Sequence, residues 1–204
     1  MYIYSDTNLI VVDKPAGLLA VPGKGEAGRA HLAGKVQARF ADALIVHRLD
    51  QATSGLMVLA RGAAVQRSLS RAFENRQVGK QYLAIVEGEM HGTEGSIDLP
   101  LAADWPQRPR QKVDAAHGKL SLTHWQRAEG PAPAGCTRLL LQPVTGRTHQ
   151  LRVHLAHIGH PICGDALYAP APLRSTRLLL HACELTLVHP VTGVQQSWSS
   201  PAPF

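Results

Sequence analysis

Short apolar runs separated by glycine, proline and polar turn residues recur along the chain, and they constrain its fold more than any other feature. Residues 8–12 (NLIVV), 55–60 (GLMVLA) and 137–141 (TRLLL) have the length of buried strands. Residues 79–88 (GKQYLAIVEG) alternate between apolar and polar side chains, as half-buried strands do. The same reasoning assigns strands to residues 95–101, 119–129 and 137–144, and to the two parts of 177–200 that flank a turn at 190–193. Loops are expected at residues 16–28, 104–112 and 129–135.

Helical spacing of apolar residues is confined to a few segments. Residues 63–76 place Val65, Leu69 and Phe73 on one face and Arg67 and Arg71 on another. Residues 148–159 place Leu151, Leu155 and Ile158 on one stripe, and residues 29–40 suit a short helix. We therefore predict an α+β fold, a single domain built on a mostly antiparallel mixed sheet flanked by a few helices.

Composition adds a preference for a polyanionic partner. The chain of 204 residues has a net charge of +6, and a basic surface gains free energy by releasing counterions from a phosphate backbone. No stretch has the unbroken apolar length of a membrane span and no basic export signal is visible, so we expect a cytoplasmic protein that does not engage a membrane. Cys136, Cys163 and Cys183 show no CxxC spacing, which favours reduced, packed thiols.

The segment HRLDQATSGL (47–56) is the clearest candidate for chemistry, because it places the carboxylate of Asp50 shortly before Thr53, Ser54 and Gly55. In one interpretation Asp50 ends a strand and caps a turn, and its partners are the backbone amides or hydroxyl groups of Thr53 and Ser54. In the other it is a reactive carboxylate, which needs a nearby cation to keep it ionised and oriented.

The segment GRTHQLRVH (146–154) supplies cations for such a site. His149 and Arg152 are three residues apart, so we expect them to share one face of the second helix, opposite much of its apolar stripe. A solvated helix arginine is the alternative explanation of Arg152. The region also suggests a metal site formed by His149, His154, His157, His160 and Asp165. We reject a metal site because this set contains no HExxH motif or other recognisable ligand pattern.

Several motifs together resemble the ribosomal large subunit pseudouridine synthase A family. HRLDQATSGL is similar to the family signature HRLD, two variable residues, then TSG. TGRTHQLRVHL (145–155) resembles its third motif, and GHPICGDALY and RLLLHA resemble the segments that follow. The second motif is matched by Lys80, Tyr82, Ala84, Val86 and Gly88. The resemblance covers nearly the whole chain and implies one pseudouridine synthase catalytic domain, residues 1–204, without an N-terminal S4-like module.

The resemblance implies an isomerase that converts uridine to pseudouridine in RNA. The reaction breaks the bond from ribose C1′ to uracil N1 and rejoins the base through C5, so neither a cofactor nor a metal is expected. The loop at 104–112 is most similar to A-type members, which implies dual specificity for a tRNA anticodon stem-loop and a 23S rRNA hairpin. No obligate protein partner is implied.

The family pattern also implies a role for each matching residue. Asp50 is the catalytic carboxylate, which either attacks C1′ or acts on the ribose to trigger elimination. Tyr82 lies against the base and helps to remove the C5 proton, and Arg152 pairs with Asp50.

Further residues of the motifs are expected to bind RNA or to support the loop. Arg48 enters the space that the flipped-out base leaves, because a guanidinium can stack there and bind phosphate. His47, Arg147 and His149 are grouped with Arg48 as RNA-binding or base-flipping residues, with His47 also supporting the loop. Thr53, Ser54 and Gly55 hold the loop in place.

Two other functions were considered. A noncatalytic RNA-binding protein or RNA chaperone would keep the basic surface, for which we expect Arg67, Arg71, Arg108, Arg110 and Lys112 to be exposed. The presence of Asp50, Tyr82 and Arg152 argues against that reading. A glycoside hydrolase would need a second carboxylate in a comparable motif, which the sequence lacks.

Overall fold

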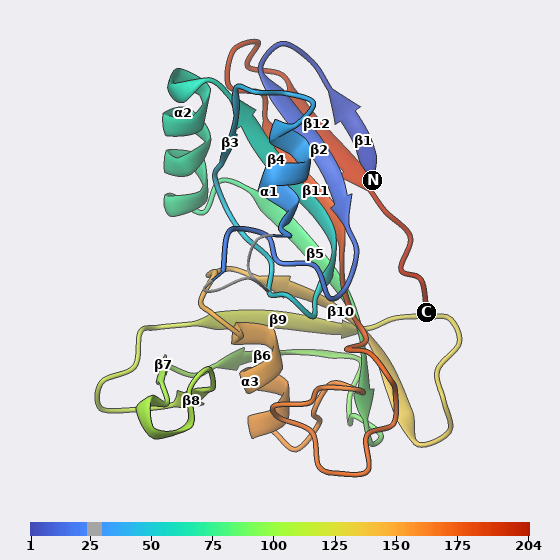
Figure 1. Ribbon diagram of the computed structural model, residues 1–204. Coiled ribbons are helices and arrows are strands. Elements are labelled where there is room, and N and C mark those ends of the chain that lie inside the picture. The colour runs from blue at the N-terminus through green and yellow to red at the C-terminus, as the bar shows by residue number, and fades with distance from the viewer. Residues whose placement is uncertain (24–29) are drawn as a thin grey trace. The chain divides into compact units, whose positions relative to one another are not determined.

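Residues 1–23 and 30–204 are described by a computed structural model, and their contacts divide them into two units. Unit 1 consists of residues 1–80 and 181–203, and unit 2 consists of residues 81–180 together with Phe204. Strand β5 (Gly79–Glu87) begins in unit 1 and continues in unit 2 (Figure 1).

Unit 1 is built on a mixed sheet. Its other elements are β1 (Tyr2–Ser5), β2 (Leu9–Lys14), α1 (Leu32–Gln37), β3 (Ala43–Ile45), β4 (Ser54–Arg61), α2 (Ala63–Glu74), β11 (Leu180–Val188) and β12 (Gln195–Ser199). The strands follow the order β1-β2-β4-β11, with β12 paired to β11 and β3 paired to β4. The β11–β4 pairing is parallel, and the β1–β2, β2–β4, β3–β4 and β11–β12 pairings are antiparallel.

The core of unit 1 explains its sequence pattern. Every residue of β4 except Arg61 is buried, so this strand is covered on both faces and carries a continuous apolar run instead of an alternation. Helix α2 packs against β4 and β3 and buries Val65 and Leu69 (Figure 1). Arg67 and Arg71 lie on its exposed face, as predicted. The amphipathic pattern of this helix was therefore read correctly.

Unit 2 contains a second group of antiparallel strands and one α-helix. Its other elements are β6 (Glu94–Asp98), β7 (Leu101–Ala103), the 3-10 helix η2 (Trp105–Gln107), β8 (Gln111–Val113), β9 (Leu122–Arg127), β10 (Cys136–Pro143) and α3 (Gln150–His157). The order β5-β10-β9-β6 is antiparallel throughout, and β7 and β8 form a separate two-stranded sheet. The strands predicted at 119–129 and 137–144 are β9 and β10, which pair with each other.

The α+β class with a mostly antiparallel sheet is confirmed, whereas some element boundaries were wrong. Residues 95–101 form two strands, β6 and β7, because Pro100 between them has no N–H to donate to a ladder. Residues 104–112 are not a simple loop, since they contain η2 and the start of β8. Residues 24–29 lie outside the described residues, and with them Gly25, Gly28 and the first residue of the helix predicted at 29–40. A single domain over 1–204 stays a prediction.

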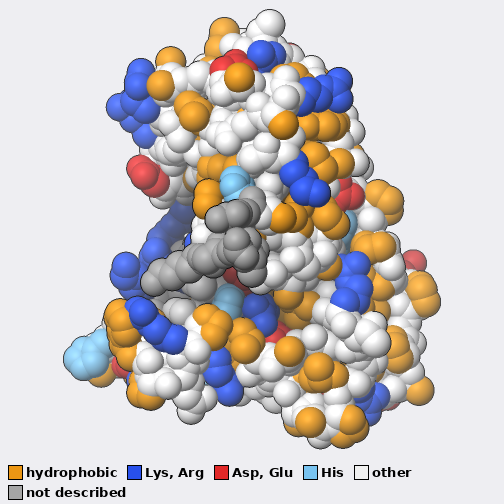
Figure 2. All heavy atoms as spheres, in the orientation of Figure 1, with side chains coloured by type: hydrophobic (Ala, Val, Ile, Leu, Met, Phe, Trp, Pro, Cys, Tyr) orange, Lys and Arg blue, Asp and Glu red, His pale blue; other side chains and the backbone are white. Residues whose placement is uncertain are grey.

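Two surface properties bear on partners. Lys and Arg side chains occur on the visible face of both units (Figure 2), as the net charge of +6 predicts. Within residues 1–23 and 30–204, none of the helices has both the length and the apolar character that a membrane span requires.

Candidate functional site

Asp50 lies in a tight turn directly before β4 in unit 1. Its backbone carbonyl accepts a hydrogen bond from the N–H of Thr53 at 3.1 Å, and Leu49 beside it is buried. Gln51 ties this turn to the loop after β2, because its carbonyl accepts from the N–H of Gly17 at 2.8 Å and its side-chain amide donates to the Gly17 carbonyl at 3.0 Å. The predicted turn is present, and its backbone is held from two directions.

Lys14, which no sequence motif predicted as a site residue, also supports this loop. Its side chain is fully buried at the end of β2, and Nζ donates to the backbone carbonyls of Pro15 (3.0 Å), Leu18 (2.8 Å) and Gln51 (3.1 Å). A buried ammonium group is costly unless its donors are satisfied, and these oxygens accept hydrogen bonds from it. The ammonium of Lys14 therefore fixes Gln51, the residue that follows Asp50.

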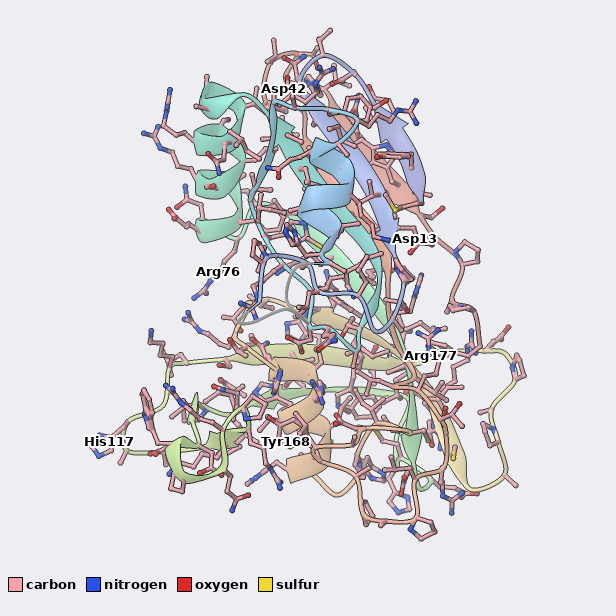
Figure 3. The ribbon with its side chains drawn as sticks, in the orientation of Figure 1. Asp13, Asp42, Arg76, His117, Tyr168 and Arg177 are labelled. Atoms are coloured by element: carbon pink, nitrogen blue, oxygen red, sulfur yellow. The ribbon has the colours of Figure 1, made fainter. Side chains whose placement is uncertain are left out.

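A second buried network joins the start of β4 to distant segments of unit 1. Nδ1 of His181 lies 2.9 Å from the hydroxyl of Ser54, and its Nε2 lies 3.2 Å from the carbonyl oxygen of Ser200. Because a carbonyl can only accept, Nε2 carries a proton toward Ser200, and Nδ1 shares a hydrogen bond with the hydroxyl of Ser54. The hydroxyl of Ser200 donates to Asp13 at 2.8 Å, and Figure 3 shows Asp13 near the end of β2. The side chain of Ser54 is thus joined to this network, and its supporting role stays a prediction.

Gly55 is required by the close approach of β11 to β4. Gly55 and Ala182 are direct partners in the parallel pairing, and a Cβ at position 55 would collide with the backbone of Ala182. The residue also has φ 115°, a conformation that side chains rarely adopt. The glycine of the TSG sequence is therefore fixed by packing as well as by its dihedral angle.

His47 and Arg48 are adjacent in sequence but differ in environment. Nε2 of His47 accepts a hydrogen bond from the N–H of Val58 at 3.0 Å, and the ring stacks on Phe73 with centroids 4.4 Å apart. Burial, with a smaller contribution from the positive charge of Lys80, lowers the pKa of His47 to about 3. His47 is therefore a neutral acceptor that joins the loop to β4 and α2. Arg48 is exposed, as a residue that reaches RNA must be.

In unit 2 the structure corrects the predicted helix around Arg152. Helix α3 begins at Gln150, and His149 precedes it with φ 55°, so His149 and Arg152 do not share a helix face. Arg152 is only 4% exposed, which rules out the solvated arginine that sequence alone left open. Ile158 follows the last helical residue and is 37% exposed, so of the predicted stripe only Leu151 and Leu155 are buried, within a run from Gln150 to Leu155 that is buried throughout.

The buried guanidinium of Arg152 is held by Asp165. Its Nε donates to Oδ2 and its Nη2 donates to Oδ1, both at 2.7 Å, which is a two-point charge-assisted contact. Oδ1 of Asp165 also accepts from the backbone N–H of Leu167 at 2.9 Å. Asp165 had been considered only as a metal ligand. In the folded chain it is the residue that orients Arg152.

Tyr168 links this ion pair to neighbouring segments of unit 2. It lies beside α3 (Figure 3), and its hydroxyl accepts a hydrogen bond from the N–H of Gln111 at 2.7 Å and lies 2.8 Å from Nδ1 of His149. The guanidinium groups of Arg110 and Arg152 lie 5.3 Å and 5.2 Å from the centre of its ring. Burial is the main cause of a raised pKa at Tyr168. The phenol therefore stays protonated at neutral pH.

The remaining predicted residues of unit 2 are Tyr82 and Arg147. Tyr82 lies on β5 opposite Leu141 and is partly buried. Arg147 is exposed, and its backbone N–H donates to Oε1 of Gln150 at 3.0 Å. The same oxygen accepts from Thr145 at 2.7 Å, so the buried amide of Gln150 shapes the turn that presents Arg147. Asp50 and its neighbours thus belong to unit 1, and Tyr82, Arg147, His149 and Arg152 belong to unit 2.

The histidines considered as metal ligands have other contacts. Nδ1 of His154 lies 3.0 Å from the hydroxyl of Thr123, and its Nε2 lies 3.0 Å from the carbonyl oxygen of Leu99. Nδ1 of His160 lies 3.0 Å from the carbonyl oxygen of Glu87. Within the described part of the chain, no group of three or more His, Cys, Asp or Glu side chains could hold a metal ion.

Comparisons with known proteins agree with this architecture. A family model described as RNA pseudouridylate synthase matches residues 8–157. The chain is 45% identical to the dual-specificity RNA pseudouridine synthase RluA of Escherichia coli (strain K12), an alignment that covers 99% of this chain and 93% of that protein. The protein of the same name from Haemophilus influenzae is 43% identical over the same shares. The solved structure of human RNA pseudouridylate synthase domain containing 1 has a TM-score of 0.83 at 29% identity and covers 100% of this chain and 83% of its own.

The α+β fold is therefore that of the pseudouridine synthases. The chain belongs to the RNA pseudouridylate synthase family, and it is an RNA-modifying isomerase whose substrate is uridine in RNA. The family predicted from the HRLD and TSG sequences is confirmed.

Proposed function

We propose that this enzyme isomerises uridines that are flipped out of structured RNA loops, with Asp50 as the catalytic carboxylate. The observation that carries the proposal is the location of the HRLD signature, whose aspartate occupies a turn held by Thr53, Gly17 and Lys14. A carboxylate that must act on one atom of a bound sugar benefits from such a fixed backbone, because a misplacement of about 1 Å can cost two orders of magnitude in rate.

The chemistry assigns a task to each of three side chains. The C1′–N1 bond breaks, a C1′–C5 bond forms, and the proton lost from C5 is balanced by one gained at N1. Asp50 starts the reaction, by attack on C1′ or by acting on the ribose, and both routes depend on its negative charge. Tyr82 assists removal of the C5 proton. Arg152 supports the charge of the carboxylate. Its guanidinium is held in one orientation by the two contacts with Asp165.

A base in a stacked loop has to leave its stack before a carboxylate can reach its sugar. Arg48 is exposed beside the Asp50 turn, and we assign it the space that the flipped base leaves. In the same proposal, the side chains of Arg147 and His149 also bind the RNA. The near-full-length likeness to the dual-specificity RluA proteins supports action on two RNAs. We propose that these are a tRNA anticodon stem-loop and a 23S rRNA hairpin, and that the enzyme acts in the cytoplasm without an obligate protein partner. The one catalytic domain spans residues 1–204.

The Asp50→Asn variant tests the proposal. It keeps the size of the side chain and removes its charge, so tritium release from C5-labelled uridine should vanish on both RNAs while affinity in filter binding stays within about tenfold, or 1.4 kcal/mol. Asp42→Asn is the matched control, because Asp42 is a solvent-accessible carboxylate of the same unit. Wild-type turnover on only one of the two RNAs would remove dual specificity. Near-normal turnover by folded Asp50→Asn protein would refute the assignment of the carboxylate.

A further inference from the structure

The loop between β7 and β8 presents an unusually exposed aromatic side chain. Trp105 is 68% exposed, and among the described residues it is the one Phe, Trp or Tyr side chain that is mostly exposed. A tryptophan ring can bury 150–250 Å² of surface, so exposing it forgoes a large apolar contribution within the monomer. An exposed aromatic side chain of this kind marks an interaction surface when the neighbouring side chains can bind the same partner.

The ring is already engaged on one side by a cation. The guanidinium of Arg108 lies 3.6 Å from the centre of the Trp105 ring, which is the distance of a parallel stack. The chain from Trp105 to Lys112 also contains the half-buried Arg110, and Lys112, whose side chain is 51% exposed, lies 3.4 Å from Oδ2 of Asp114. Figure 2 shows basic and hydrophobic side chains next to one another over the part of unit 2 where Figure 1 places β7 and β8. An aromatic face among guanidinium groups matches a nucleobase attached to a phosphate.

The backbone of this loop is closed and anchored. The N–H of Asp104 donates to the carbonyl of Arg110 at 3.0 Å, and the N–H of Arg110 donates to the carbonyl of Gln107 at 2.9 Å. At the base of the loop, Gln111 donates its N–H to the hydroxyl of Tyr168, whose ring lies next to Arg152. Trp105 is therefore held on a fixed support that is joined to the segment carrying the Arg152–Asp165 pair.

We propose that Trp105 and Arg108 form a stacking platform for an unpaired nucleobase of the RNA loop, with Arg110 and Lys112 contacting its phosphates. The inference deepens the proposed function, because it requires that the substrate is an RNA loop with unpaired bases. It predicts preference for a hairpin loop over a duplex, since bases inside a duplex have no free face to stack on the indole. Trp105 contributes to binding, and it takes no part in bond breaking.

The test compares Trp105→Ala, Trp105→Phe and Leu120→Ala. Leu120 is the matched control, because it is an apolar side chain of the same unit that is 73% exposed and carries no stacked cation. Affinity is measured by filter binding for an anticodon stem-loop and for a fully paired duplex of equal length. Stacking of one base is worth about tenfold to a hundredfold in affinity, so Trp105→Ala should weaken hairpin binding by that factor and leave duplex binding unchanged. Trp105→Phe should retain most of the affinity, and Leu120→Ala should match wild type.

A single-turnover rate at saturating RNA completes the test. This rate should stay within about twofold for Trp105→Ala, because stacking affects binding and not the chemical step. An equal loss of affinity on hairpin and duplex, or a Trp105→Ala affinity equal to that of Leu120→Ala, would overturn the platform. A change of oligomeric state in sedimentation would reassign the surface to a second copy of the chain. None of these outcomes depends on Asp50→Asn, whose loss of turnover tests the proposed function separately.

Discussion

Asp165→Asn should be among the most destabilising single changes of charge in the described chain. The side chains of Asp165 and Arg152 are 0% and 5% exposed, and two contacts of 2.7 Å join them. Asparagine keeps an oxygen for the N–H of Leu167 and turns an NH₂ group toward the Nε–H of Arg152, so a donor then faces a donor. Removing one partner of a buried ion pair costs about 3–5 kcal/mol, and we expect about 3 kcal/mol because the turn is kept.

Urea unfolding followed by circular dichroism measures this decrease in the free energy of unfolding, and thermal unfolding gives the change in Tm. In a chain of this size, 1 kcal/mol corresponds to about 2–4 °C in Tm, so the melting temperature should fall by about 6–12 °C. Asp42→Asn is the control, since Asp42 and Arg61 form an exposed pair, with side chains 46% and 27% accessible, whose loss should cost less than about 1 kcal/mol. Tritium release by Asp165→Asn should fall sharply even where the variant is fully folded, because Arg152 loses the carboxylate that orients it.

A double variant separates orientation from stability. Arg152→Met combined with Asp165→Asn removes the cation that faces the new amide, so it should recover part of the free energy of unfolding while remaining inactive. An Asp165→Asn loss no greater than that of Asp42→Asn would show that the buried pair does not stabilise unit 2. Normal turnover in the folded single variant would show that Asp165 does not position Arg152 for the reaction.

Two further predictions concern the loop around Asp50. Gly55→Ala should lower the free energy of unfolding by about 3 kcal/mol or more, because the added Cβ meets the backbone of Ala182 at a positive φ. Gly193→Ala, which also has a positive φ but open space around it, should lower it by about 1–2 kcal/mol. Urea unfolding measures both, and equal losses would contradict the packing argument. The pKa of His47 is about 3 in the folded chain, so below pH 6.5 the unfolded chain binds a proton that the folded chain does not. Stability should therefore fall by up to about 1.4 kcal/mol per pH unit from pH 6.5 toward 3, and His47→Gln, which keeps an acceptor for the N–H of Val58, should flatten that slope. Parallel slopes would exclude His47 as its source.

The elements that the sequence predicted well are those with a local physical cause. The unbroken apolar run of β4 follows from burial on both faces, and the four-residue spacing of Val65 and Leu69 follows from the single buried face of α2. The motif around Asp50 was equally readable, because its residues are contiguous. Helix α3 was harder, since no capping side chain marks where it begins: His149 precedes it in the left-handed region without being a glycine, and only the fold shows this.

The supporting residues of the site were not predictable because their partners are distant in sequence. Ser54 and His181 are 127 residues apart, and no periodicity links them. The pair of Arg152 and Asp165 is closer in sequence, and one local signal was available. An aspartate after a glycine often begins a turn, in which its carboxylate accepts hydrogen bonds from the backbone N–H groups two and three residues later, as Asp165 does. That signal identifies an oriented carboxylate without naming the cation that it holds.

Lys14 shows a limit of a different kind. A buried lysine in an apolar strand predicts some compensating partner, and a carboxylate would be sought first. Three acceptors that hold Nζ within the loop are the backbone carbonyls of Pro15, Leu18 and Gln51, and every residue type carries such an oxygen. The side-chain identities at positions 18 and 51 therefore do not encode this contact, although the backbone path does. It follows that the placement of the Asp50 turn depends on the chemistry of one lysine and on the backbone paths of two loops. The residue types reveal the lysine, whereas the paths of the loops are known only from the fold.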